Sequence, residues 1–454
     1  MFGKNKNVAA TNPMEMGPSV EFKAMGASDQ ENQATAIHAR QSPGIAPTRM
    51  VIAQAIGQNA GRLLMDYTAQ GVALRLDVDG FWHNQSPMDR QNGDAMLEVM
   101  KKLANLDPSE RRARQMGEFK ATFQRVTRLC QITSQGVDTG ERVIIRLIDP
   151  KQEQMSLIDL GMREQMVNDF CERIGRPTGE QMPPPPKGIY ILSAPPNGGG
   201  ISTLWVAAMT ATDRYTRDFL GVEEKTRREP EIENVDVTVF NESNGETAVE
   251  VIPKILMRQP DVFVVPHISN TETLDLLCEI TETEGKVIIT STRAKSAAEA
   301  LLKLLGAASN KVTFIKHVNL VVNMRLVRRL CEGCKMPFQA TVQVLHQLQL
   351  PPDRAALYQE YHPPPVDPNV PKNKQDLPPP ICQRCGGMGY MGRIGMFEML
   401  IVDDNIRQAL GQQPSADIVQ QLAVKAGMVT LREEGIALLA QGITSIPELQ
   451  RALQ

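Results

Sequence analysis

Residues Gly188 to Thr203 read GIYILSAPPNGGGIST, and this stretch decides which fold class the sequence predicts. The apolar run Ile189 to Leu192 predicts a buried strand, and the glycines of the segment Asn197 to Gly200 free the backbone to turn. From Ser202 onward an apolar helical segment begins. A strand, a glycine-rich turn and a helix N-terminus in this order are typical of a phosphate-binding loop, because the N–H groups of the turn and the helix dipole attract anions.

Compared with the template G-x-x-x-x-G-K-[ST], the loop keeps the shape but loses the charge. Gly200 and Ser202 match, whereas Pro195 occupies the position of the first glycine and Ile201 that of the lysine. Successive N–H groups at this helix N-terminus could still bind a nucleotide phosphate weakly. The candidate nucleotide-binding residues are Asn197, Gly198, Gly199, Gly200, Ile201, Ser202 and Thr203. A strand-turn-helix that binds no ligand is the alternative, since glycine turns of this kind are common.

Length and charge exclude several classes of protein. With 454 residues, 42% of them hydrophobic, the chain is long enough for two to four domains with cores of their own. Its 49 basic and 52 acidic residues give a net charge of −3, so we expect no nucleic-acid partner on electrostatic grounds. No apolar run reaches the length of a bilayer span, and the N-terminal stretch MFGKNKNVAATNP lacks the apolar core of a signal peptide. We therefore expect a cytoplasmic protein.

The composition divides the chain into successive segments. Residues 1–48 contain no leucine and are rich in Ala, Gln, Asn, Ser and Pro, which predicts a disordered tail. Residues 49–160 predict a mixed α/β domain, and residues 161–186, a helix around Arg163 to Ile174 followed by a proline run, predict a linker. In residues 187–330 apolar strands alternate with helices. We expect there a mostly parallel sheet covered on both faces, with any ligand at the carboxyl ends of its strands.

Two C-x-x-C pairs among the seven cysteines predict a metal centre. Cys331 and Cys334 form the first pair, Cys382 and Cys385 form the second, and the segment 331–393 that contains them carries a proline-rich insert. Four thiolates in paired knuckles suit a structural tetrahedral Zn²⁺, and a chain without a signal peptide favours metal over disulfides. A redox role for the pairs is the alternative.

Separated blocks of this sequence occur together in one protein family, and they cover almost everything after residue 50. Besides the loop itself, the blocks are MKKLANLDPSERRARQMGEF (100–119), GERVIIRLID (140–149), RQPDVFVVPHISNTET (258–273), NMRLVRRLCEGC (323–334), CQRCGGMGYMGRIGMFEML (382–400) and GMVTLREEGIALLAQGITSIPEL (427–449). In content and order they resemble the secretion and pilus-assembly ATPases of the type II secretion and type IV pilus systems.

This resemblance implies an α/β fold with an N-terminal mixed α/β domain and a RecA-like, P-loop ATPase core over residues 187–330. It implies a tetracysteine zinc module inserted over 331–393 and a helical C-terminal region over 394–454. The implied cofactors are Zn²⁺ in the module and ATP with Mg²⁺ at the loop. The implied assembly is a homo-hexamer, or a mixed ring with an active relative, which binds an inner-membrane platform protein at the cytoplasmic face of that membrane.

The departures from the family's pattern fall on positions that carry the chemistry. Ile201 replaces the lysine of the phosphate loop, and His267 replaces the glutamate of the Walker B motif. Lys286 and Arg293 stand where the family has two histidines, and the acidic E-D-P box remains only as Arg228-Glu229-Pro230. We therefore expect no intact catalytic residue, and a pseudo-ATPase in which hydrolysis is weak or lost.

Two alternatives remain open. The chain could be an active motor ATPase whose missing groups come from elsewhere, for instance from Lys286, Arg293 or an adjacent subunit. It could also be a nucleic-acid binder of the zinc-knuckle kind, which only the knuckle and the nearby arginines favour. Salt-dependent binding to DNA or RNA would be the evidence for the second alternative.

Overall fold

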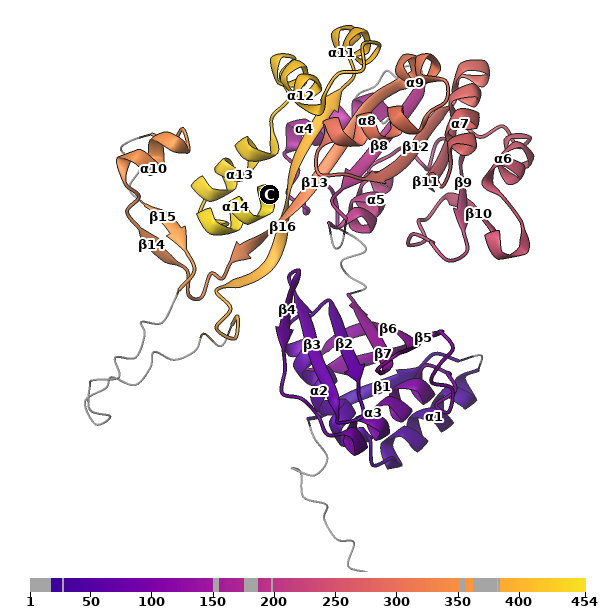
Figure 1. Ribbon diagram of the computed structural model, residues 1–454, viewed down its shortest axis with the longest axis vertical. Coiled ribbons are helices and arrows are strands. Elements are labelled where there is room, and N and C mark those ends of the chain that lie inside the picture. The colour runs from indigo at the N-terminus through magenta and orange to yellow at the C-terminus, as the bar shows by residue number, and fades with distance from the viewer. Residues whose placement is uncertain are drawn as a thin grey trace, which may run out of the picture. The chain divides into compact units, whose positions relative to one another are not determined.

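The computed structural model describes residues 18–26, 28–149, 155–174, 187–196, 199–351, 356–361, 382 and 384–454. Contacts divide the chain into two units, Met1–Gln152 and Glu153–Gln454, and each unit contains a seven-stranded sheet (Figure 1). Among the described residues, no helix is long and apolar enough to cross a bilayer.

The N-terminal unit is an antiparallel sheet with three helices against one face (Figure 1). Its strand order is β1-β5-β6-β7-β2-β3-β4. Exposed and buried residues alternate along β7, because the helices cover only one face of the sheet. The elements are β1 (Val20–Ala24), α1 (Asp29–Gln41), α2 (Ile45–Gly57), β2 (Arg62–Tyr67), β3 (Val72–Val78), β4 (Phe81–Asn84), α3 (Arg90–Leu103), β5 (Gln115–Phe123), β6 (Val126–Val137) and β7 (Gly140–Ile148).

The structure corrects the prediction of a disordered tail over residues 1–48. Residues 1–17 lie outside the described part of the chain, but residues 18–48 contain β1, α1 and the start of α2, so the prediction was wrong for them. β1 pairs with β5 along its whole length, and the side chain of Ser28 caps α1. Low leucine content misled the prediction, because an edge strand gains its backbone hydrogen bonds from the sheet and needs few buried side chains of its own.

The C-terminal unit is built on a largely parallel sheet, as the sequence predicts. The strand order is β10-β9-β11-β12-β8-β13-β16, and only the last pair, β13 with β16, is antiparallel. Its strands are β8 (Gly188–Ala194), β9 (Phe219–Glu224), β10 (Val235–Phe240), β11 (Val262–His267), β12 (Val287–Arg293), β13 (Val318–Leu330) and β16 (Tyr390–Ile401). The helices of this core are α4 (Glu164–Ile174), α5 (Ile201–Thr210), α6 (Ala248–Leu256), α7 (Thr271–Glu284), α8 (Ala297–Ala307) and α9 (Lys311–His317).

Helices cover both faces of this sheet. All seven residues of β8 are buried, as expected for a central parallel strand. Ile189 and Ile191 belong to one core cluster, together with apolar residues of α6, α7, α8 and α9. Tyr190 and Leu192 belong to the other cluster, together with residues of α4 and α5. The loop after β8 therefore emerges from the centre of a three-layered domain (Figure 1).

The segment predicted as a linker contains a helix that belongs to the core. Met166, Phe170 and Ile174 recur at every fourth residue of α4, so they form one apolar stripe, and all three are buried against the sheet. Leu157 and Leu160 lie in the same cluster, which moves the boundary between the units from residue 160 to about 152. The helix predicted around Arg163 to Ile174 is thus present as α4, but its assignment to a linker was wrong. The proline run lies outside the described residues.

The region after the cysteines also differs from the predicted boundaries. The prediction began the helical region at residue 394, but β16 extends to Ile401 and completes the core sheet. Four helices follow: α11 (Asp404–Leu410), α12 (Ala416–Lys425), α13 (Leu431–Ala440) and α14 (Ile446–Leu453). Between the cysteine pairs lie β14 (Met336–Phe338), α10 (Val342–Gln347) and β15 (Leu357–Gln359), and β14 pairs with β15. The expected helical C-terminal region is thus confirmed from residue 404 onward.

Candidate functional site

The glycine-rich segment connects β8 to α5, as the sequence predicts. Asn197 and Gly198 lie outside the described residues. At Gly199 a Cβ atom would lie 2.2 Å from the carbonyl oxygen of Pro195, so only glycine fits. Gly200 has φ of 84°, in the left-handed region that glycine adopts without strain. No side chain caps the N-terminus of α5, and the N–H groups of its first turn remain available to an anion.

The side chain at the lysine position of the loop is part of the core. Ile201 is 3% exposed and belongs to the cluster that packs α4 and α5 on the sheet. Ser202 is exposed and Thr203 is half-buried, so their hydroxyl groups lie nearer to solvent. The loop therefore offers backbone N–H groups and hydroxyls to a phosphate, and this position contributes no positive charge.

Two of the other positions that differ from the family's motifs lie at the carboxyl ends of the parallel strands, the same edge of the sheet as the loop. Arg293 ends β12 and pairs in register with Ala194, which ends β8, and His267 ends β11 next to them. Lys286 instead precedes β12, where its carbonyl oxygen accepts a hydrogen bond from the N–H of Gly188. Since a strand rises about 3.3 Å per residue, Lys286 lies roughly 23 Å from Arg293 along the strand. Within one chain, Lys286 therefore belongs to the opposite edge and is not part of this site.

A buried carboxylate meets His267 at this edge. Glu229, in the segment after β9, places Oε1 3.0 Å from Nε2 of His267, and its side chain is 5% exposed. Burial alone would raise the pKa of Glu229, but the nearby His267 and Ser202 side chains, with the charge of Arg293, hold it below the usual range. The sequence marked this residue only as the remnant Arg228-Glu229-Pro230. Its contact with His267 appears only in the folded chain.

A second carboxylate was missed by sequence reasoning. Glu223 lies near the carboxyl end of β9, and its Oε2 accepts a hydrogen bond from the N–H of Glu229. Burial raises the pKa of Glu223 to about 7, and the charge of Glu229 adds to this effect. The only signal in the sequence was the pair Glu223-Glu224 at the end of an apolar strand. The site thus contains two carboxylates, an imidazole and a serine hydroxyl beside the loop.

The four predicted metal ligands come together in a separate centre. The Sγ atoms of the four cysteines all lie within 4.8 Å of one another. The Sγ atoms of Cys331 and Cys382 are 3.9 Å apart, and those of Cys334 and Cys385 are 3.6 Å apart. In a tetrahedron with metal–sulfur bonds of about 2.3 Å, the sulfur atoms lie roughly 3.8 Å apart. The tetrad therefore has the dimensions of a closed Zn²⁺ site.

The antiparallel hairpin of β13 and β16 assembles this centre. Cys331 follows β13 directly, and Cys385 precedes β16, so pairing of the two strands brings together cysteines that are 51 residues apart. Backbone N–H groups of Cys385 and Arg384 lower the pKa of the Cys382 thiol to about 7. Burial instead raises the pKa of Cys331 and that of Cys334, and a bound cation would offset this effect by stabilising their thiolates.

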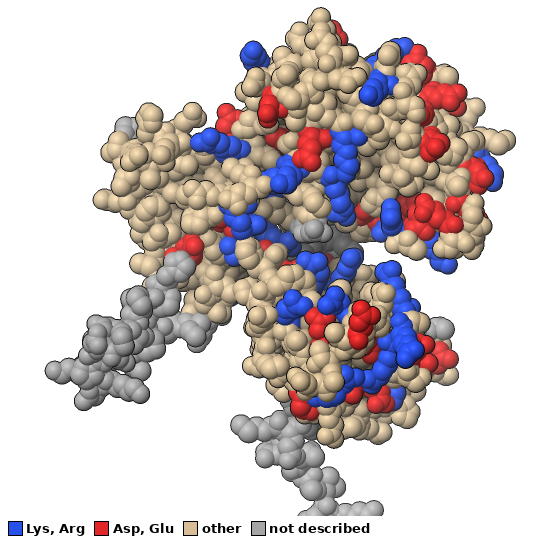
Figure 2. Space-filling model, viewed as in Figure 1, with Lys and Arg blue, Asp and Glu red and all other residues tan. Residues whose placement is uncertain are grey.

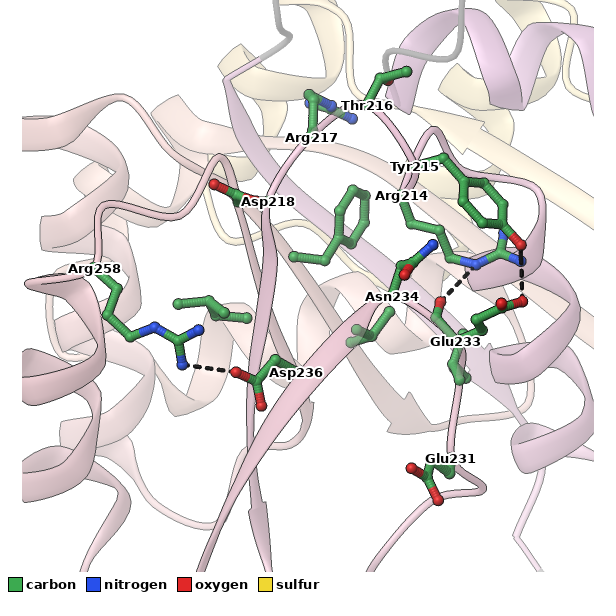
Figure 3. Close-up of a pocket in the computed structure, with 14 residues that line it drawn as sticks. Arg214, Tyr215, Thr216, Arg217, Asp218, Glu231, Glu233, Asn234, Asp236 and Arg258 are labelled. Atoms are coloured by element: carbon green, nitrogen blue, oxygen red, sulfur yellow. Dashed lines mark hydrogen bonds and ion pairs between the residues drawn. The ribbon is translucent and has the colours of Figure 1, made fainter.

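An open pocket in this unit lies away from the loop. It has a volume of about 600 Å³ and is formed at the amino ends of β9 and β10 (Figure 3). Arg258 pairs with Asp236 at 2.7 Å on one side, and on the other the hydroxyl of Tyr215 donates to the carboxylate of Glu233. Because ligands of parallel sheets bind at the carboxyl ends of the strands, this pocket is not the expected nucleotide site.

Charged side chains of both signs are mixed on the face shown in Figure 2. In the N-terminal unit, where basic side chains gather on that face, several arginines have carboxylate partners. Asp66 pairs with Arg75 and Arg142, and Asp77 pairs with Arg62, all at 2.6 Å. These ion pairs neutralise part of the positive charge of the arginines in the N-terminal unit.

The parallel core, its phosphate-type loop and the tetracysteine insert together define a RecA-like α/β protein with an additional N-terminal unit. The chain belongs to the family described as "Type II/IV secretion system protein", whose model matches residues 39–451. This confirms the resemblance seen in the sequence.

Individual relatives agree with the family. The type IV pilus assembly ATPase PilB of Thermus thermophilus is 27% identical over 88% of this chain, which spans 42% of that relative's length. The type II secretion system protein E of Klebsiella pneumoniae is 27% identical over 91% of this chain and 76% of its own.

Solved structures show the same fold at low identity. The ATPase DotB of Yersinia pseudotuberculosis aligns with a TM-score of 0.57 and 13% identity, over 90% of this chain and 93% of its own. The pilus retraction motor PilT, solved with bound ADP, aligns with a TM-score of 0.52 and 14% identity, over 88% of this chain and 95% of its own.

Proposed function

We propose that this chain is a subunit of a type II secretion or type IV pilus assembly motor in which ATP hydrolysis is weak or lost. The observation that carries the proposal is the composition of the loop edge. The lysine position is filled by a buried isoleucine, Ile201, and the Walker B position by His267, which contacts Glu229. The subunit would then act as a scaffold or as a nucleotide-responsive part of the motor.

The energetic reason lies in the charge of the transferred phosphate. A hydrogen bond from a charged donor contributes about 1.5 to 3 kcal/mol, and more where charge develops in the transition state. Ile201 removes that donor. A carboxylate at the Walker B position would orient water or the hydrated Mg²⁺ through its negative charge, and a neutral imidazole lacks that charge. Binding through backbone N–H groups remains, but the stabilisation specific to the transition state does not.

The proposed assembly follows from the family. We propose a homo-hexamer, or a mixed ring with an active relative, that binds an inner-membrane platform protein from the cytoplasmic side. The family membership and the secretion and pilus-assembly relatives support this proposal. The N-terminal unit and the four C-terminal helices supply folded surfaces beyond the loop that could serve such contacts.

The test is a calorimetric titration with ATP and Mg²⁺, followed by a phosphate-release assay on the same sample. We expect weak or no binding and no turnover. The double variant Ile201→Lys with His267→Glu restores the lysine of the phosphate loop and the glutamate of the Walker B motif. Phosphate release gained only in that variant would support the proposal. Tight binding with steady phosphate release by the unaltered chain would contradict it, provided that Ser202→Ala removes that release.

The alternative, an active ATPase with groups supplied from elsewhere, has one observation in its favour. Arg293 lies at the same edge as the loop, and its positive charge acts on Glu229. If Arg293 replaced the missing lysine, the assembled ring would release phosphate and Arg293→Ala would abolish that release. Under the proposal there is no release to abolish.

We also propose that the cysteine tetrad holds a structural Zn²⁺. Its dimensions and its closed set of four sulfur ligands support this assignment. Metal analysis of the purified chain should give one zinc per chain, and Cys331→Ser combined with Cys382→Ser should remove it. Cys278→Ser is the matched control, because Cys278 is buried in the core far along the chain from both pairs.

A further inference from the structure

The contact between Glu229 and His267 leaves one carboxylate oxygen unsatisfied. Oε1 of Glu229 lies 3.0 Å from Nε2 of His267, while Oε2 is buried and has no hydrogen-bond partner among the described residues. The Ser202 hydroxyl is close enough to affect the pKa of Glu229 but does not complete a hydrogen bond to Oε2. An unsatisfied buried carboxylate oxygen is costly, so we expect a further group to complete this site.

The geometry is that of two ligands on one metal ion. Metal–nitrogen and metal–oxygen bonds to histidine and carboxylate are about 2.0 to 2.2 Å long. Two such ligand atoms at a right angle around one ion lie about 3.0 Å apart, which is the separation of Nε2 and Oε1. A hydrogen bond between them has the same length, but it would leave Oε2 without a partner. A metal ion that binds both carboxylate oxygens of Glu229 together with Nε2 of His267 gives Oε2 the partner that the hydrogen bond does not.

The ligand atoms present do not fit Mg²⁺. Mg²⁺ prefers an octahedron of oxygen atoms, from carboxylates, phosphates and water, and imidazole is not among its usual ligands. An imidazole with a carboxylate and a hydroxyl instead suits divalent transition metals such as Co²⁺, Ni²⁺ and Zn²⁺. The substitution that removes the Walker B carboxylate therefore changes the class of metal that this edge of the sheet can hold.

We propose that Glu229 and His267, with the Ser202 hydroxyl beside them, bind a divalent transition-metal ion at the loop edge, separately from the cysteine tetrad. Glu223 supports the site, because its Oε2 accepts the N–H of Glu229 and helps to fix the ligand segment. The positive charge of Arg293 lies nearby and would repel a metal ion. Because the side chain of Arg293 is exposed, solvent screens this repulsion. The proposal does not depend on nucleotide binding.

The experiment uses the full chain saturated with Zn²⁺, so that the cysteine tetrad is filled. Co²⁺ is then added, and bound zinc and cobalt are measured by elemental analysis after dialysis, with visible spectra to detect any cobalt on thiolates. We expect one additional cobalt per chain with no loss of zinc and without the strong absorption of a cobalt–thiolate site. Mg²⁺ should bind at least ten-fold more weakly, measured by competition.

Variants separate this site from adventitious binding. Glu229→Gln and His267→Gln should each weaken cobalt binding by at least ten-fold. His267→Glu should weaken cobalt and strengthen Mg²⁺ binding, a reversal that a misfolded variant would not show. His346→Gln and Glu279→Gln, at exposed positions of α10 and α7, are the matched controls and should bind as the unaltered chain does. Absence of the additional cobalt, or equal binding by all variants, would overturn the proposal, whatever the result of the ATP titration.

Discussion

Gly199 has the most restricted side-chain space of the loop glycines that the structure describes. The main chain of Pro195 approaches it so closely that a Cβ atom would meet a carbonyl oxygen at 2.2 Å. Because that oxygen is backbone, Gly199→Ala must shift the turn, and we expect it to destabilise the C-terminal unit by about 1 to 3 kcal/mol in urea unfolding. Gly306→Ala in α8 is the control. A Cβ atom there meets nothing within 4 Å, so a neutral effect or a gain of up to about 1 kcal/mol is expected.

Glu223 makes the stability of the site depend on pH. Burial raises its pKa in the folded chain to about 7, from 4.5 as the ordinary value. The folded state therefore holds a proton that the unfolded state releases, and this contribution to stability is present below pH 4.5 and lost as the pH rises through 7. The difference corresponds to at most about 3 kcal/mol.

We accordingly expect Glu223→Gln to remove part of the fall in stability between pH 5 and pH 8, measured by urea unfolding. Glu98→Gln serves as the comparison, since Glu98 is half-exposed and forms a surface pair with Lys102. The interpretation of Glu223 fails if both variants show the same pH dependence as the unaltered chain.

At the scale of elements, a buried ion cluster holds the last helix, α14, against β13. The side chain of Glu448 in α14 is fully buried and pairs with Arg328 of β13 at 2.8 Å and with Arg451 at 2.5 Å. The Arg328 guanidinium also lies 3.9 Å from the ring centre of Tyr390, which begins β16 after the cysteine pairs. Arg328 thus contacts both the last helix and the strand that follows the cysteine tetrad.

Removing the carboxylate charge of Glu448 should therefore weaken the packing of α14 against β13. Glu448→Gln leaves Arg328 without its buried counter-charge, and we expect a loss of about 3 kcal/mol in the unfolding free energy of this unit. Burial alone would raise the pKa of Glu448, but hydrogen bonds from Arg451 and Arg328 bring it below its usual value. The stabilisation by ionised Glu448 is therefore present above the ordinary pKa of a glutamate and is lost as the pH falls through the pKa of Glu448 in the folded chain. The destabilisation caused by Glu448→Gln should accordingly become smaller in acid.

Hydrogen exchange would locate this effect. Faster exchange in residues 446–453 of the variant, with unchanged exchange in the N-terminal unit, agrees with the structure. The surface pair of Glu98 with Lys102 again provides the control, because removing an exposed pair should cost less than about 0.5 kcal/mol. Equal losses in both variants would contradict the role of the buried cluster.

At the scale of the whole molecule, the two units have separate sheets and separate cores. We therefore expect the segment 1–152 to fold when expressed alone, with a melting temperature within a few degrees of its transition in the full chain. Calorimetry of the full chain should show two transitions, of which a chelator lowers only the one that belongs to residues 153–454. A single transition, or a segment 1–152 without helical signal in circular dichroism, would show that neither unit folds independently.

The sequence predicted those features that are local in the chain. The strand-turn-helix of the loop, the parallel core and the paired cysteines depend on periodicity, glycine position and ligand spacing within short segments, and all are present in the structure. Predictions failed where the local composition of a segment did not reveal its contacts in the folded chain. The leucine-poor segment is held by pairing of β1 with β5, and α4 looked like a linker although its stripe of every fourth residue packs on the sheet.

The sequence marked Ser202, His267 and Glu229 separately, but only the tertiary structure showed that they share one site with Glu223. Glu223, Glu229, His267 and Ser202 come from four separate segments, and their meeting depends on the order of the parallel strands, which brings the carboxyl ends of β8, β9 and β11 to one edge. The same geometry places Lys286 at the opposite edge from Arg293, although the two are only seven residues apart in sequence. Spacing along a chain determines which residue types are present, but the packing of the sheet determines which of them share a site.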